Sequence, residues 1–420
     1  MADELRLTPE EQAMLAGEAG SGVQKAMDIV VALGRIYGAA DLVPVDSVQV
    51  SGVSYKNLGQ AGLEFLEEWA AQGARARVPA TLNPAGMDIE AWAELGFSAE
   101  FARRQQAVVA AYRRLGILAT CTCAPYLVGH RPESGRHLAW AESSAVSYAN
   151  SVLGARTNRE GGPSALAAAI TGRTARYGLH LEENRRPTAI VDVRCPVRSE
   201  ADLGALGYLV GRRVRNGVPL FRGLEVPPPF PGAGPEHWHL GLRTLGAAMA
   251  ASGAVALYHV EGLTPEAPAG LRPAPGAQRL EVDDLAPGYA ALDGPATEID
   301  LVSLGCPHAS LAELEAVADH LAGRRVAAAL WITTARDIRR EAQAAGLVAR
   351  IEAAGGRVVA DTCMVVAPVE ELGFHSLATN SAKMAFYAPS HSGLAVRFGP
   401  LGQCLSAALT GRWPASAETR

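Results

Sequence analysis

The sequence has few cysteines, no long apolar run and no excess of basic charge, and each of these absences excludes a class of protein. Six cysteines scattered over 420 residues do not form the disulfide framework of a small secreted domain. The 38 basic and 43 acidic residues are mixed along the chain and give a net charge of -5, so there is no basic stripe for nucleic acid. Apolar stretches are broken well short of a membrane span, and residues 1–6 lack a cationic, apolar targeting head. We therefore expect a cytoplasmic protein that binds neither nucleic acid nor membrane.

The length of the chain predicts more than one packed unit. Prolines gather at 227–231 and 265–276, which indicates rigid, turn-rich connections. We expect an α/β region at 1–200, a turn-rich peripheral subregion at 201–294, and a second α/β region at 295–420.

Three cysteine segments follow predicted strands. Apolar runs at 115–120, 299–304 and 356–360 read as buried strands that lead into Cys121 and Cys123, Cys306, and Cys363. The segment 298–363 reads as a doubled βαβ unit, whose right-handed crossovers make the strands parallel. Because ligands of open α/β sheets collect beyond the carboxyl ends of parallel strands, we expect the thiols to meet at one site.

Thiolates select zinc, copper(I) or iron-sulfur clusters. A structural zinc site usually takes four ligands in close pairs, a spacing that this chain lacks. Three single thiols leave a coordination position free for a substrate oxygen, so we interpret the site as iron that acts as a Lewis acid on a hydroxyl leaving group. Inert buried cysteines or a nucleophilic thiol are the alternatives that these residues leave open. Cys195 and Cys404 are most simply small buried hydrophobes.

Polar side chains are dense between residues 142 and 164. Arg156 and Arg159 are suited to grip a carboxylate by a two-point contact, and the alternative is an ion pair with a neighbour such as Glu160. The alternate spacing of His237 and His239 suggests a metal pair on a strand, but without a third ligand nearby we favour ordinary packing.

Several motifs together closely resemble the large subunit of the aconitase X family, over residues 5 to 393. They are 51–55, 123–126, 142–145, 150–164, 305–308 and 361–363. The resemblance implies an aconitase-like fold, with several α/β/α units and parallel sheets around a central metal-cluster cleft. It also implies that Cys123, Cys306 and Cys363 hold an iron-sulfur cluster (2Fe-2S or 4Fe-4S) or a mononuclear iron. Cys121 is an extra thiol beside the expected ligand.

The same resemblance implies roles for the polar residues. Lys383, Ser143 and Glu142 are expected at the catalytic centre, with Lys383 anchoring a carboxylate because a lysine is ordinarily a cation. The expected substrate contacts, to which we add the two arginines above, are Gly52, Val53, Ser54, Asn83, Pro84, Arg156 and Arg159. Read alone, Lys383 is typical of a surface cation, and turn chemistry explains the segments 52–54 and 83–84.

Members of this family dehydrate small hydroxy acids. Our first choice is a hydro-lyase that converts cis-3-hydroxy-L-proline to Δ1-pyrroline-2-carboxylate. The alternatives are a mevalonate 5-phosphate dehydratase and a non-catalytic iron-sulfur scaffold or regulator. The family also uses a small swivelling domain that supplies a catalytic serine, and nothing after Gly393 is long enough to be that domain. We therefore expect a separate small subunit as the partner.

Overall fold

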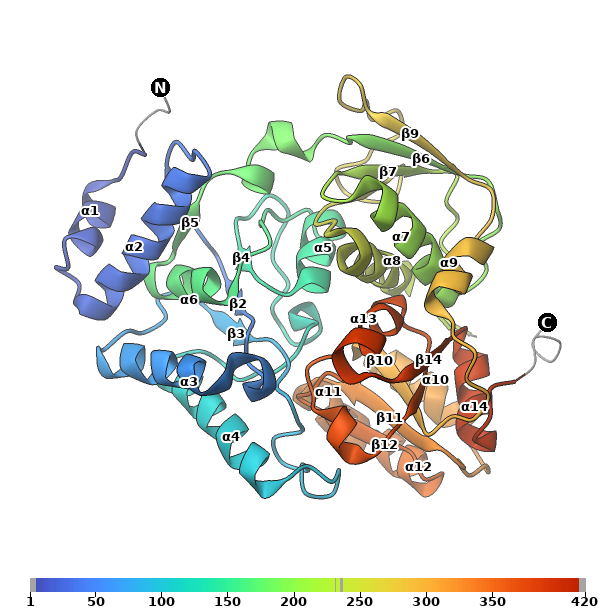
Figure 1. The fold of residues 1–420 in the computed structure, drawn as a ribbon. Helices are drawn as coiled ribbons and strands as arrows, with labels where there is room; N and C mark the ends of the chain where they lie inside the picture. The colour runs from blue at the N-terminus through green and yellow to red at the C-terminus, as the bar shows by residue number, and fades with distance from the viewer. Residues whose placement is uncertain (1–4, 231, 235–236, 415–420) are drawn as a thin grey trace.

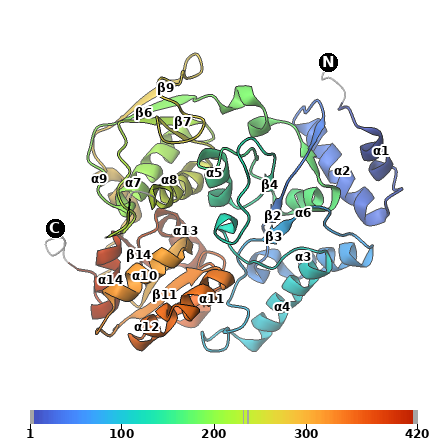
Figure 2. The same ribbon diagram turned by 180° about the vertical axis from the view of Figure 1, so that it is seen from behind.

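The computed structural model describes residues 5–230, 232–234 and 237–414, and it is built from three parallel β-sheets with helices packed around them (Figures 1 and 2). The residues on which the targeting-segment expectation rests lie mostly outside these ranges. Parallel sheets covered by helices are the α/β fold that the sequence predicts.

The first sheet has the order β3-β2-β4, and its three short strands are parallel and buried. An antiparallel pair, β1 with β5, lies beside it. The strands of this part are β1 Leu42–Pro44, β2 Val48–Val50, β3 Ala80–Leu82, β4 Ala139–Trp140 and β5 Arg173–Ala175. Its helices are α1 Pro9–Leu15, α2 Ser21–Ile36, α3 Tyr55–Ala71, α4 Ala99–Arg114, α5 Ser143–Ser151 and α6 Gly162–Thr171.

The second sheet has the order β8-β7-β6-β9 and is also parallel. Its elements are β6 Ala189–Val193, α7 Glu200–Val214, β7 Pro219–Arg222, α8 Trp238–Gly253, β8 His259–Val260 and β9 Gln278–Val282. Strand β6, which the sequence analysis places in the first region, belongs to this sheet. Helices α7 and α8 pack so closely that Gly253 has no room for a side chain. A Cβ at this position would lie 1.9 Å from the carbonyl oxygen of Gly211. His237 and His239 lie at the start of α8 and not on a strand.

The third sheet has the order β12-β11-β10-β13-β14. All of its pairings are parallel. Its strands are β10 Leu301–Ala309, β11 Ala329–Thr334, β12 Arg357–Ala360, β13 Ser376–Thr379 and β14 Ala395–Phe398. The helices of this part are α9 Ala286–Leu292, α10 Leu311–His320, α11 Arg336–Ala344, α12 Leu347–Ala353, α13 Ala382–Ser392 and α14 Leu401–Thr410. Helices α11 and α12 are separate, because Gly346 takes a left-handed conformation with φ of 75° between them.

The order in which strands are added to the third sheet reverses at β10. The chain adds β11 and β12 on one side of β10 and then returns to place β13 on the other side. Such a reversal opens a crevice at the carboxyl ends of the strands, which is where ligands bind in open α/β sheets. Cys306 lies at this end of β10, where the register with β11 is interrupted between Leu304 and Ala309.

One strand prediction is wrong. Residues 115–120 form no strand, and only Leu118 makes a bridge, to Thr81 of β3. Gly116 takes a φ of 80°, and the side chain of Leu118 is 55% exposed. The apolar run before Cys121 is therefore a loop along the edge of the first sheet.

The hydrophobic core joins the three parts of the molecule. Its largest described cluster includes Met87, Tyr148, Leu245, Leu301 and Met384, which come from elements around all three parallel sheets. The sheets are thus held against one another by continuous apolar packing. Among the described residues, no helix has the length and hydropathy that crossing a bilayer requires.

Candidate active site

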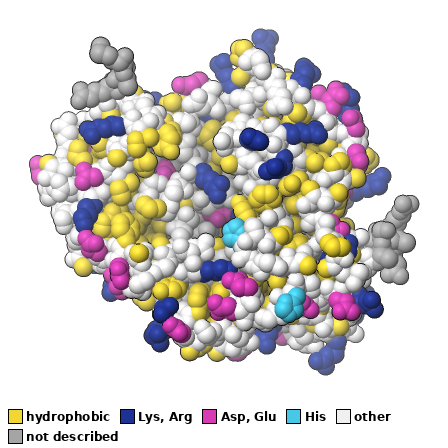
Figure 3. Space-filling view, in the orientation of Figure 1, with side chains coloured by type: hydrophobic (Ala, Val, Ile, Leu, Met, Phe, Trp, Pro, Cys, Tyr) yellow, Lys and Arg dark blue, Asp and Glu magenta, His cyan; other side chains and the backbone are white. Residues whose placement is uncertain are grey.

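The carboxyl ends of strands from two sheets deliver polar side chains to one cavity of about 200 Å³. Segments after β3 and β4 of the first sheet and after β12 and β13 of the third contribute to it, together with Cys306 within β10. The residues that line it are Asn83, Pro84, Cys123, Glu142, Ser143, Arg159, Cys306, Cys363, Val365, Val366, Lys383, Tyr387 and His391. In Figure 3, basic, acidic and histidine side chains gather at the centre of the visible face.

The three predicted metal ligands share this cavity. The thiol of Cys363 is hydrogen-bonded to Cys306, and this contact lowers the pKa of Cys306 to about 7 and raises that of Cys363. Cys123 is 4% exposed, and burial raises its pKa to about 12. The backbone N–H of His308 donates to the Cys123 sulfur at 3.2 Å. The cysteines thus come from two sheets and meet around one space.

These residues fit an iron-sulfur group. Within the described part of the chain, no three His, Cys, Asp or Glu side chains are placed to hold a single metal ion. A cluster makes a different demand, since it needs several cysteine thiolates around one space. Three thiols on the walls of one cavity satisfy that demand, and Cys123, Cys306 and Cys363 are the residues that would hold the cluster.

A buried ion pair lies beside the thiols. Lys383, in the first turn of α13, is 8% exposed, and its Nζ contacts Glu142 Oε1 and lies 3.4 Å from Ser144 Oγ. Glu142 is the N-cap of α5 and accepts hydrogen bonds from the backbone N–H of Ser144 at 3.3 Å and from Asn83 Nδ2 at 3.0 Å. The carboxylate is therefore held from several directions.

The two groups of this pair keep each other charged. Burial opposes ionisation of Glu142, but the charge and hydrogen bond of Lys383 lower its pKa to about 2. Burial likewise opposes the charged form of Lys383, but Glu142 raises the lysine pKa above its ordinary value. A lysine cation is thus fixed at the wall of the cavity, where it can bind a carboxylate.

Asn83 offers an unused acceptor at the same wall. Its amide nitrogen is committed to Glu142, whereas its Oδ1 is buried and has no hydrogen-bond partner within the described residues. A buried polar atom without a partner at a cavity is available to a ligand hydroxyl. Ser143, whose Oγ lies 3.4 Å from Glu142 Oε1, adds a hydroxyl to the lining.

The structure separates the two arginines. Arg159 lines the cavity, is exposed, and makes no side-chain hydrogen bond or ion pair with any described residue. Arg156 lies outside the cavity lining, because its guanidinium pairs with Glu182 and lies 3.4 Å from the carbonyl of His180. Its partner is Glu182 and not the Glu160 that its position in the sequence suggested, and substrate contact by Arg156 stays a prediction.

The segment Gly52–Ser54 contacts residues next to the cavity and not the cavity itself. None of its three residues lines the cavity. Ser54 Oγ donates to the carbonyl of Val366 at 2.7 Å, and the carbonyl of Val53 accepts from Gln105 Nε2 at 2.9 Å. Direct substrate contact by this segment stays a prediction.

Cys121 belongs to a different cavity. It takes a φ of 42° and lines a space of about 390 Å³ together with Arg113, Arg336 and Arg340. Burial raises its pKa above the ordinary range of a thiol. Only Cys123 of this pair reaches the cavity of Cys306 and Cys363.

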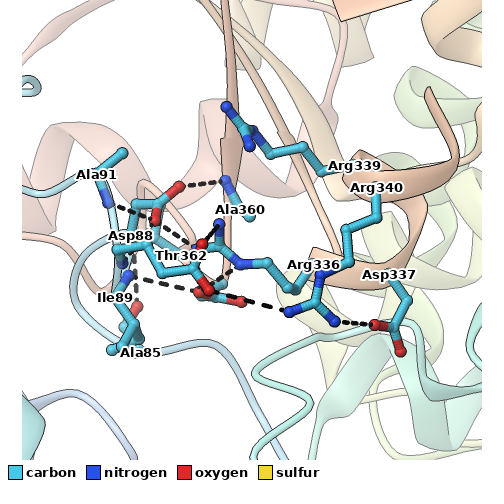
Figure 4. A network of polar contacts seen from close by, with 12 residues as sticks. Ala85, Asp88, Ile89, Ala91, Arg336, Asp337, Arg339, Arg340, Ala360 and Thr362 are labelled. Carbon is cyan, nitrogen blue, oxygen red and sulfur yellow. Dashed lines mark hydrogen bonds and ion pairs between the residues drawn. The ribbon is translucent and has the colours of Figure 1, made fainter. Parts of the chain in front are cut away.

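Two buried residues beside the ligand segments, Arg336 and His308, have partners that no local sequence pattern predicts. Arg336 binds Asp88 and Asp361 in the interior and Glu90 nearer the surface, and so joins the first region to the chain before Cys363 (Figure 4). His308 contacts segments that carry the other cysteines. It lies in the quoted motif 305–308, but its partners are 54 and 186 positions away, so no local signal reveals them.

A fixed lysine cation beside three thiols, at the carboxyl ends of parallel strands, is the arrangement expected of an aconitase-like hydro-lyase. The comparisons with known proteins make the class specific. Models of the first, second and third domains of aconitase X match residues 4–183, 187–286 and 299–410. The chain belongs to the aconitase X family.

Relatives that carry a functional name, and a solved structure, agree with this family assignment. The phosphomevalonate dehydratase large subunit of Methanothermobacter thermautotrophicus is 52% identical over 91% of this chain and 94% of its own length. The cis-3-hydroxy-L-proline dehydratase of Pseudomonas aeruginosa is 38% identical over 98% of this chain and 71% of its own length. The crystal structure of the holo-form of Thermococcus kodakaraensis aconitase X is 45% identical, covers 96% of this chain and 100% of its own, and superposes with a TM-score of 0.87.

These comparisons confirm the family, the aconitase-like fold and the assignment to the dehydratases. They favour the phosphomevalonate alternative over our first choice of hydroxyproline, because relatives with the phosphomevalonate name reach higher identity. The hypothesis of a non-catalytic scaffold is not supported, since these relatives are named as enzymes.

Proposed function

We propose that this chain is the large subunit of a mevalonate 5-phosphate dehydratase that works with a separate small subunit. The observation that carries this proposal is Arg159, an unpaired cation at the cavity. Lys383 is paired with Glu142, whereas Arg159 is a cation of the cavity lining without an acidic partner among the described residues. A phosphate is the group of the substrate that such a free guanidinium binds by two parallel hydrogen bonds. Hydroxyproline carries no phosphate, and its ammonium would be repelled by a nearby guanidinium.

Sequence identity supports the proposal without deciding it. Four phosphomevalonate dehydratase large subunits are 45% to 52% identical to this chain. A fifth, from Aeropyrum pernix, is 36% identical, which is no closer than the 38% of the Pseudomonas hydroxyproline enzyme. The charge at Arg159 therefore adds a physical criterion that identity lacks.

The partner is proposed from the relatives and the family resemblance. The archaeal relatives are named as large subunits, and this chain matches 94% to 99% of the length of the first two. It matches 71% and 69% of the two hydroxyproline dehydratases. We infer that a small swivelling-domain subunit closes the cavity and supplies the base.

The reaction removes one proton and one hydroxyl group from adjacent carbons. The C2 proton, next to the carboxylate of mevalonate 5-phosphate, passes to the base, and the C3 hydroxyl leaves as water. An iron-sulfur cluster held by Cys123, Cys306 and Cys363 would supply a Lewis acid for that hydroxyl.

The residues of this chain bind the substrate and stabilise the charge that develops. Lys383 donates an N–H to the substrate carboxylate, which gains negative charge as the neighbouring proton departs. Glu142 and Ser144 hold the lysine in place. Asn83 Oδ1 and Ser143 Oγ bind the C3 hydroxyl of the substrate, and Arg159 binds the phosphate as a fork-shaped donor.

The test is turnover of two substrates by the reconstituted pair of subunits. Mevalonate 5-phosphate and cis-3-hydroxy-L-proline are supplied separately, and loss of one water is followed by mass spectrometry. We expect dehydration of mevalonate 5-phosphate. Loss of hydroxyproline with no conversion of the phosphate ester would reject the proposal.

Two arginine variants sharpen this test. Arg159→Met should raise KM for mevalonate 5-phosphate about 10- to 100-fold, because a hydrogen bond to a charged group contributes roughly 1.5–3 kcal/mol. Arg156→Met is the matched control, since its arginine is paired with Glu182 outside the cavity. Equal effects of the two substitutions would show that Arg159 has no special role.

A further inference from the structure

The three proposed ligand cysteines lie on three separate segments of the chain. Cys123 follows the loop at the edge of the first sheet, whereas Cys306 lies within β10 and Cys363 follows β12 of the third sheet. A cluster bound by three segments requires them to hold their relative positions when the cluster is absent. One residue, His308, contacts all three segments.

His308 reaches the Cys123 segment in two ways. Its backbone N–H donates to Cys123 Sγ at 3.2 Å, and its Nδ1 lies 2.9 Å from Thr122 Oγ1. The same Thr122 hydroxyl accepts from the backbone N–H of Ala124 at 3.1 Å. The residues on both sides of Cys123 are therefore connected to the imidazole.

The other ring nitrogen reaches the Cys363 segment. His308 Nε2 lies 2.7 Å from the carbonyl oxygen of Thr362, and a carbonyl can only accept, so Nε2 carries the proton. Nδ1 of the neutral ring is then an acceptor, and the Thr122 hydroxyl donates to it. These contacts fix one tautomer and give every polar atom of the ring a partner.

The position of His308 excludes a direct part in the reaction. Its side chain is 1% exposed and does not line the cavity. Its own carbonyl accepts from Arg243 Nη1 at 3.0 Å, and Arg243 is paired with Glu313 in the interior. Arg243 thus holds the backbone of His308, while the ring contacts the segments of Thr122 and Thr362.

We propose that His308 is a positioning residue that fixes the Cys123, Cys306 and Cys363 segments in the geometry that holds the cluster, through Thr122 on one side and Thr362 on the other. This inference rests on the cluster site of the proposed function. Outer-shell hydrogen bonds of this kind orient ligands, and their loss typically weakens metal binding about 10- to 100-fold.

The test compares retention of the cluster in matched variants of the full chain. The anaerobically reconstituted protein is exposed to an iron chelator, and the decay of visible absorption and the iron per chain are followed. Thr122→Val removes the hydroxyl and keeps the shape of the side chain, whereas Thr122→Ser keeps the hydroxyl. We expect about tenfold faster loss of iron for Thr122→Val and for His308→Ala, and nearly wild-type loss for Thr122→Ser.

A second buried histidine provides the control for packing. His259 is also 1% exposed, and its Nε2 contacts the carbonyl of Arg185 at 2.8 Å, away from the cysteines. His259→Ala should leave the rate of iron loss unchanged. If His308→Ala does not fold, the Thr122 pair still decides the matter without it.

The outcomes separate this inference from the proposed function. A wild-type chain that takes up no cluster would overturn both. A wild-type cluster lost at the same rate in Thr122→Val and Thr122→Ser would overturn the role of His308 and leave the proposed function standing. Turnover of mevalonate 5-phosphate, measured separately, reports on substrate identity alone.

Discussion

Replacement of Arg336 by leucine should destabilise the chain because it leaves buried carboxylates without their cation. Arg336 contacts Asp88 and Asp361, whose side chains are 1% and 6% exposed, and Glu90, which is 63% exposed. Figure 4 shows Asp88 beside the guanidinium of Arg336. Removal of one partner of a buried pair costs about 3–5 kcal/mol, whereas an exposed contact such as Glu90 contributes about 0–1 kcal/mol.

The two buried carboxylates are not equally dependent on the arginine. Asp88 also accepts from the backbone N–H groups of Ala91 and Ala360 at 3.0 and 2.9 Å, and its pKa is lowered although burial opposes ionisation. Among the described residues, the Asp361 carboxylate receives one backbone N–H, from Ile89 at 3.4 Å, and burial raises its pKa even with Arg336 present. We therefore assign most of the cost to Asp361.

The pH dependence follows from that assignment. In Arg336→Leu the folded-state pKa of Asp361 should rise further, so the folded carboxyl keeps its proton at pH values where the unfolded one has lost it. Stability is then present at low pH and is lost as pH rises through the folded-state pKa. The destabilisation should be larger at pH 8 than at pH 5.

The assay is urea unfolding followed by tryptophan fluorescence. Arg340→Leu is the matched control, because Arg340 is 66% exposed and its partner Asp337 is exposed as well, so its cost should stay within about 0.5 kcal/mol. The double variant Arg336→Leu/Asp361→Asn should recover part of the loss. Equal unfolding midpoints for Arg336→Leu and Arg340→Leu would refute the reasoning.

Two further predictions concern other buried charges. Lys383→Met should lower turnover by about 100-fold or more, as expected for loss of a charge-stabilising donor, while Lys383→Arg should retain more activity. Steady-state kinetics of the reconstituted pair measure both variants. Equal turnover of Lys383→Met and the wild type would show that the lysine has no part in the mechanism. Burial and the charge of Glu313 raise the pKa of Glu200 from 4.5 to about 7. Stability should therefore fall as pH rises from about 4.5 to about 7 and level off above it, and Glu200→Gln should lose this part of the slope in urea titrations at several pH values. An unchanged slope in Glu200→Gln would assign the titration to another group.

The parallel third sheet and the approach of Cys306 to Cys363 were accessible from the sequence. Alternation of apolar runs with helical segments between residues 298 and 363 specifies βαβ units, and the handedness of their crossovers places the carboxyl ends of the strands together. Cys123 was expected at the site because of a strand at 115–120 that does not form, and the roles of Glu142 and Lys383 came only from the family resemblance. Nothing in their local sequence shows that the first sheet points its carboxyl ends at the same cavity.

The failures have physical causes that a single sequence does not display. The run 115–120 is apolar enough for a strand, but a left-handed Gly116 and a single bridge leave it a loop. Arg156 and Arg159 lie three positions apart in the sequence, yet Arg156 pairs with Glu182 and Arg159 lines the cavity. Such choices depend on contacts between distant segments, as do the partners of His308 and Arg336.

The iron content of cysteine variants tests the account most directly. The chain is reconstituted anaerobically with iron and sulfide, and iron per chain and visible absorption are measured for the wild type and for single Cys→Ala variants. The account predicts that Cys123→Ala, Cys306→Ala and Cys363→Ala lose the brown chromophore and most of the iron, while Cys121→Ala and Cys195→Ala keep both. Retention of the cluster in those first three variants, or its loss in Cys121→Ala alone, would contradict the account.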